Sequence, residues 1–185
     1  MIEPLKDVIS DIADALVVID SSRIPYRNYQ PGVGPYGEPQ LLRKTAKILN
    51  SKDIYRGRVE TRRKPDLIIR GSWAIEFKLV RPFGDNGREA EYWSVNLLHP
   101  YDGSQSTLGD CLKLRQLNCS EKKAIVVVGY EHDPPVISLE PLVKSFEILA
   151  DHILKIKLGP RIIENRKNLI HPIHQQLTVY SWQVL

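Results

Sequence analysis

The spacing of apolar residues changes from a helical period to a strand period part-way along the chain. Apolar side chains recur every three or four positions over residues 3–18, and again from residue 39 to about residue 50, which predicts two amphipathic helices. Alternation then replaces this period and predicts strands over residues 54–60, 65–70 and 73–80. The chain therefore begins with two helices followed by three strands.

The second half adds helices and strands in alternation. A loop region with a short helix near residues 88–95 precedes a helix of about ten residues, for which Thr107 is the expected N-cap. The run KKAIVVVGYE is typical of a strand buried on both faces. A helix that starts at Glu140 and ends at Gly159-Pro160, and a final alternating strand, QLTVYSWQVL, complete the order. This order predicts an α/β fold with a mixed central β-sheet flanked by helices.

Size and composition narrow the class of protein. The chain has 185 residues, 42% of them hydrophobic and 26% charged, which suits one globular domain with its own core. Its apolar runs are too short for a membrane span, and its N-terminus is acidic where a signal peptide needs positive charge. We therefore expect a cytoplasmic protein without a membrane partner. The net charge of +4 permits a polyanionic partner without requiring one.

Three charged residues interrupt the two apolar strands within KPDLIIRGSWAIEFK. Glu76 and Lys78 share one face of their strand, because side chains alternate. A two-residue turn at Gly71-Ser72 would set residue 67 opposite Glu76 and leave Asp66 one step away; a bulge or a wider turn would shift this register. In either case the two carboxylates lie close enough to share a divalent cation.

A structural interpretation of the same residues stays open at this point. Glu76 can pair with Lys78 or with Arg70 in a salt-bridged polar strand face, without any metal. An assembly or structural role would follow from that arrangement.

The motif carries a family resemblance. Pro65-Asp66, nine intervening residues and Glu76-Phe77-Lys78 match the Pro-Asp…(Asp/Glu)-x-Lys pattern, and the chain resembles the restriction-endonuclease-like superfamily of PD-(D/E)xK nucleases. The resemblance implies an αβββαβ core over about residues 38–130. The N-terminal helix and the C-terminal helix and strand would be additions to one nuclease-like domain.

The resemblance also implies roles for individual residues. Asp66 and Glu76 would bind Mg²⁺, with Mn²⁺ as a substitute, and Lys78 would be the catalytic lysine. Glu38, at the start of the second helix, would be a further metal ligand and catalytic residue; a carboxylate stabilised by the helix dipole is the equally open alternative. The implied reaction is hydrolysis of phosphodiester bonds in DNA, normally double-stranded, as in a restriction-type endonuclease that forms a homodimer. A catalytically inactive DNA-binding or assembly module on the same fold is the alternative.

A run of basic residues precedes the motif. It consists of Arg56, Arg58, Arg62, Arg63 and Lys64. These side chains either form a solvated strand edge that deters aggregation or contact DNA phosphates. Gln105, just before the predicted helix at Thr107, is a further candidate for nucleic-acid binding, because a helix N-terminus can hold a phosphate. Plain capping of that helix is the alternative for this segment.

Overall fold

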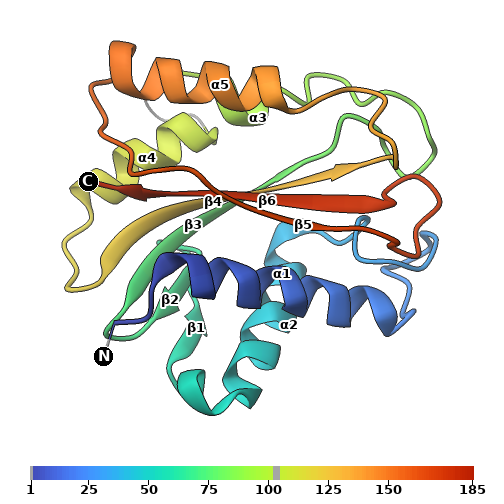
Figure 1. Cartoon of the computed structure of the whole chain (residues 1–185), viewed down its shortest axis with the longest axis horizontal. Coiled ribbons are helices and arrows are strands. Elements are labelled where there is room, and N and C mark those ends of the chain that lie inside the picture. Colours follow the sequence, from blue (N-terminus) through green and yellow to red (C-terminus); the bar gives the residue numbers. More distant parts are fainter. Residues whose placement is uncertain (1, 102–104) are drawn as a thin grey trace.

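The computed structural model describes residues 2–101 and 105–185, and its centre is one six-stranded sheet with the strand order β1-β2-β3-β4-β6-β5 (Figure 1). The strands are β1 (Val59–Thr61), β2 (Leu67–Ile69), β3 (Trp73–Val80), β4 (Lys122–Glu131), β5 (Ile162–Arg166) and β6 (Gln176–Val184). Only the β3–β4 pair is parallel within this sheet, so the sheet is mixed.

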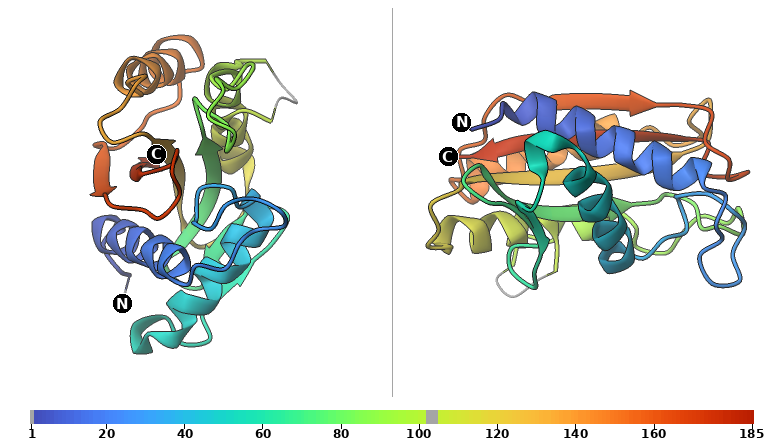
Figure 2. Two further views of the ribbon diagram at one scale, coloured as in Figure 1. Left: turned by 90° about the vertical axis from the view of Figure 1, so that its right-hand side faces the viewer. Right: turned by 90° about the horizontal axis from the view of Figure 1, so that it is seen from below.

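Helices cover both faces of the sheet (Figures 1 and 2). They are α1 (Leu5–Ser21), α2 (Glu38–Ser51), α3 (Val95–Leu98), α4 (Thr107–Gln116) and α5 (Glu140–Ile148), together with a short 3₁₀ helix (Asp53–Tyr55) and a π-helical turn (Leu149–Ile153). One core lies beneath α1 and α2, and a second lies beneath α3, α4 and α5. The predicted mixed α/β sheet flanked by helices is confirmed at this level.

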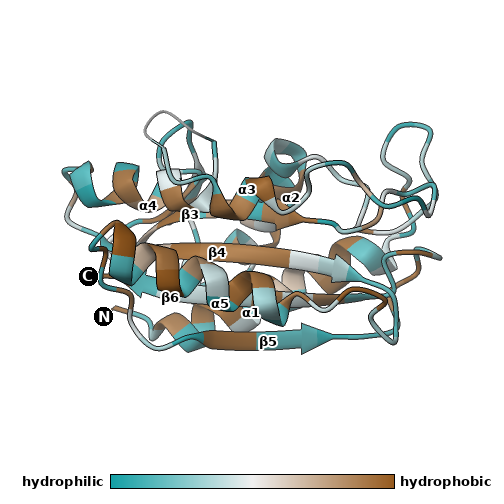
Figure 3. Cartoon of the chain, turned by 90° about the horizontal axis from the view of Figure 1, so that it is seen from above, coloured by the Kyte–Doolittle hydropathy of each residue, from teal (hydrophilic) through white to brown (hydrophobic). Residues whose placement is uncertain are grey.

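Strand β3 contributes to both cores. Phe77 and Leu79 belong to the core beneath α1 and α2, whereas Val80 belongs to the core beneath α3 to α5. Glu76 and Lys78 lie four and two positions before Val80, respectively, on the same strand face, so they point towards the α4 side. Figure 3 shows β4 brown along most of its length, as expected for a strand in the middle of two apolar layers, while the edge strand β5 ends in teal.

The β2–β3 hairpin differs from the prediction by one residue. Its register sets Leu67 opposite Ile75 and Ile69 opposite Trp73, so the loop contains three residues instead of two. Gly71 adopts a left-handed conformation (φ 72°), which glycine tolerates and which suits a three-residue hairpin loop. The expected pairing of residue 67 with Glu76 was therefore wrong, and Asp66 comes level with Glu76.

Several other boundaries also differ from the prediction. The strand expected over residues 54–60 is only Val59–Thr61, because a 3₁₀ turn and Gly57 at φ 69° occupy the preceding segment. Ser106 is the N-cap of α4 in place of Thr107, since its side chain accepts a hydrogen bond from the Gly109 N–H (3.1 Å). The short helix lies at α3, later than expected, and β5 was not predicted. Among the described residues, no helix combines the length and apolar character needed to cross a membrane.

Candidate active site

The candidate site lies beside β3, just past the N-terminal end of β2. β2 begins at Leu67, opposite Ile75, so within the described strands the later part of β3 has no partner on this side. Two carboxylates lie where a partner strand would otherwise pair with β3. The Phe77 N–H donates to Asp66 Oδ2 (2.9 Å), and the Leu79 N–H donates to Glu38. The short β2 thus leaves backbone donors that hold two acidic side chains at an open sheet edge.

Asp66 and Glu76 form a hydrogen-bonded carboxyl pair. The Glu76 residue is only 7% exposed. Burial, together with the hydrogen bond to Asp66 and its negative charge, raises the pKa of Glu76 to about 9. At neutral pH Glu76 is therefore protonated where it lies beside Asp66, in a position where a cation would also relieve the repulsion between the two carboxyl groups.

Glu38 approaches the pair from α2. It is the first residue of that helix, and Pro39 fixes the following turn. Burial raises the pKa of Glu38 to about 7, against the opposing attraction of the Lys78 ammonium group; Asp66 and Asp110 add to the rise. Glu38 therefore belongs electrostatically to the same cluster.

Lys78 has partners that the sequence motif does not contain. Its Nζ lies 3.0 Å from Asp110 Oδ2 and donates to the Gln105 carbonyl oxygen (2.8 Å). Burial lowers the pKa of Lys78, but the Asp110 and Glu38 carboxylates outweigh burial and leave the pKa above its usual value. Lys78 is therefore a fixed cation at neutral pH, suited to stabilising negative charge and unsuited to accepting a proton.

A pocket of about 180 Å³ joins these side chains. Its lining comprises Glu38, Arg63, Lys64, Asp66, Glu76, Lys78, Gln105, Asp110 and Lys113. Every predicted catalytic residue thus lies around one opening, with Gln105 and two of the predicted basic residues at its border. Four carboxylates gather there, a density that cations or protons must offset.

The donor set suits a hard divalent cation, although not as a ready-made cage. No group of three or more His, Cys, Asp or Glu side chains in the described part of the chain is arranged to hold a metal ion. Mg²⁺ is usually bound through one or two carboxylates plus water and substrate phosphates, so Asp66 and Glu76 together supply what this ion needs. The proton on Glu76 would have to leave first.

The predicted basic run does not form one surface. Arg58 turns back towards the N-terminus and binds Glu3 (2.7 Å), Arg62 binds Glu60 (2.9 Å), and Arg56 pairs with Asp53. Only Arg63 and Lys64 line the candidate site. The turn at Gly57 separates Arg56 from Arg58, and β1 separates both from Arg62, Arg63 and Lys64.

Arg58 is expected to act on stability. Burial raises the pKa of Glu3, but hydrogen bonds from Arg58 and Ser72 outweigh burial and hold that pKa at about 2. Arg58→Ala should therefore lower the free energy of unfolding by about 2 kcal/mol, because the 6%-exposed Glu3 loses its partner. Urea denaturation measures this. Arg56→Ala, which breaks a pair at the exposed surface, is the matched control and should change stability by less than about 0.5 kcal/mol. A loss of DNA affinity in Arg58→Ala without a loss of stability would contradict this role.

Glu76 does not form the salt bridge with Lys78 or Arg70 that was the structural alternative for the motif. Arg70 pairs with Glu60, and Lys78 pairs with Asp110, so neither cation neutralises Glu76. Asp110 is the functional candidate that sequence reasoning missed. It was visible as an acidic residue in the first turn of a helix, but its contact with Lys78 arises only when α4 packs beside β3.

Comparisons with protein-family models, with curated proteins and with solved structures give no match.

Proposed function

We propose that this chain is a Mg²⁺-dependent deoxyribonuclease with a restriction-endonuclease-like core and site. The observation that carries the proposal is the convergence of Glu38, Asp66, Glu76 and Lys78, from two segments of the chain, around one opening at the free edge of β3. The Asp66–Glu76 pair would hold the metal and Glu38 would complete its surroundings. A bound Mg²⁺ would polarise the phosphodiester and activate a water molecule.

The chain's own residues would then have distinct tasks. Lys78, kept protonated by Asp110, would stabilise negative charge that develops on the phosphate. Phe77 and Leu79 would hold the acidic side chains through their backbone N–H groups. Arg63 and Lys64 would attract the polyanionic substrate towards an otherwise acidic centre.

Plasmid cleavage tests this function directly. We expect the chain to nick or linearise plasmid DNA in the presence of Mg²⁺ or Mn²⁺ and to lose this activity with excess EDTA. Duplex, single-stranded and branched DNA would be compared under the same conditions. Homodimer formation, which would let two sites act on the two strands of a duplex, would be followed by sedimentation in the same buffer.

A non-catalytic DNA-binding or assembly module is the second candidate. The Lys78–Asp110 pair favours it, because Asp110 already neutralises the lysine without any metal or substrate. Uptake of Mn²⁺ or of DNA without cleavage under any of these conditions would support this candidate over the nuclease.

Metal binding should depend on pH. Glu76, with its pKa near 9, and Glu38, with its pKa near 7, must lose protons before they can act as anionic ligands. We therefore expect Mn²⁺ affinity to rise by up to about tenfold per pH unit between pH 7 and pH 9, with proton release into the buffer. Calorimetry in two buffers of different ionisation enthalpy measures both quantities. An affinity that stays constant over this range would contradict the proposed ligands.

A further inference from the structure

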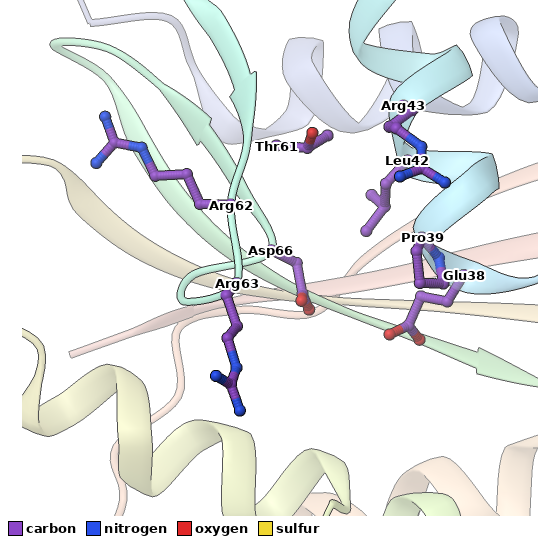
Figure 4. Close-up of a pocket in the computed structure, with 8 residues that line it drawn as sticks. All are labelled: Glu38, Pro39, Leu42, Arg43, Thr61, Arg62, Arg63 and Asp66. Atoms are coloured by element: carbon purple, nitrogen blue, oxygen red, sulfur yellow. The ribbon is translucent and has the colours of Figure 1, made fainter.

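A second, larger pocket adjoins the candidate site along α2. It encloses about 460 Å³ between α2 on one side and the segment that joins β1 to β2 on the other (Figure 4). Three residues, Glu38, Arg63 and Asp66, line both pockets. The carboxylates of Glu38 and Asp66 face the space between the two walls (Figure 4). The two pockets therefore form one continuous depression, with the acidic pair at the junction.

The larger pocket combines an apolar part with two exposed arginines. Pro39 and Leu42 supply the apolar part from α2, and Leu42 is buried. Arg43 and Arg63 are exposed, and neither forms an ion pair within the described residues. Arg62 differs, because Glu60 holds it and it extends away from Glu38 and Asp66 (Figure 4). An apolar surface next to two available guanidinium groups suits a nucleobase joined to a phosphate.

We propose that this pocket binds the unpaired nucleotide next to the scissile phosphate of a DNA strand. Its base would lie against Pro39 and Leu42, and its phosphate would contact Arg43 and Arg63. The volume falls within the range of pockets that enclose a small molecule, roughly 300–1,000 Å³. A base has to leave the duplex stack before it can enter a pocket of this kind, which favours an unpaired nucleotide. The inference rests on the proposed nuclease function and narrows its substrate to strands with an unpaired nucleotide at the cut.

Binding measured without metal tests the pocket separately from catalysis. Fluorescence anisotropy in EDTA would compare a labelled oligothymidylate of about ten nucleotides, the same strand in a duplex, and a backbone of the same length that lacks bases. We expect the single strand to bind at least about tenfold tighter than either other probe. Arg43→Ala and Arg63→Ala should each weaken single-strand binding about tenfold and lower the salt slope by about 0.7.

Arg56→Ala is the matched control, because Arg56 lines neither pocket and pairs with Asp53. It should bind every probe as the unchanged protein does. The nucleotide-binding role of the pocket would be overturned if duplex or base-free probes bound as tightly as the single strand, or if the arginine variants bound like the control. This holds even if the protein cleaves DNA. If single-strand binding depends on Arg43 and Arg63 but the protein never cleaves DNA, the nucleotide-binding role of the pocket would be supported and the proposed nuclease activity overturned.

Discussion

Lys78→Met should lower the rate of DNA cleavage by at least about a hundredfold at saturating Mg²⁺. The lysine is the one cation that lies on β3 beside Glu76, and loss of a preorganised charge at a reacting phosphate commonly costs a factor of 10² to 10³. Metal binding should survive, because Asp66 and Glu76 are unchanged. Plasmid nicking at several Mg²⁺ concentrations would separate a lower maximal rate from weaker metal binding.

A second substitution distinguishes catalysis from structure. Lys78→Met leaves Asp110 with Lys113 alone (2.7 Å), so some loss of stability is expected. If Lys78 only neutralised Asp110, the double variant Lys78→Met/Asp110→Asn would recover both stability and cleavage. If Lys78 acts on the phosphate, that double variant should recover stability and remain inactive. Lys144→Met on α5 removes a positive charge remote from the site and should cleave normally.

Strand β3 was predictable from local pattern because apolar side chains lie on one face and charged side chains on the other. Alternation set its bounds at residues 73–80 and separated Glu76 and Lys78 from Phe77, as the structure has them. The register of the preceding hairpin was not predictable in this way. It depends on whether Gly71 takes a left-handed conformation inside a three-residue loop, and residue order alone allows either loop.

Partners that come from distant segments escaped prediction for a related reason. Asp110 reaches Lys78 only because α4 lies on the same sheet face as the charged side of β3, a matter of packing and not of spacing. The basic run shows the converse: consecutive arginines looked like one strip, but Gly57 and the ion pair of Arg58 with Glu3 direct them to different places. β5 was missed because only its first residues are apolar and because it is the last strand at one end of the sheet.

Glu76→Gln should make the metal-free protein more stable at alkaline pH and remove its response to metal. The folded-state pKa of Glu76, about 9, lies above the unfolded value, so its contribution is present at low pH and is lost as pH rises towards 9. Glutamine keeps the hydrogen bond to Asp66 without an ionisable group. We expect equal stability near pH 5 and a gain on the order of 2 kcal/mol at pH 9 in urea denaturation.

Thermal unfolding with and without Mn²⁺ tests whether Glu76→Gln removes the stabilisation by metal. The unchanged protein should gain stability from Mn²⁺, whereas Glu76→Gln should gain little, since a ligand that binds only the folded state stabilises it. Glu131→Gln is the matched control: burial also raises the pKa of Glu131, but this residue lies at the far end of β4 and should leave the Mn²⁺ response intact. A Glu76→Gln protein that is less stable than the parent at pH 9, while chelator has no effect on either, would instead identify Glu76 as a structural residue. The same outcome would make the carboxylate cluster a feature of folding and leave the nuclease proposal without its metal ligands.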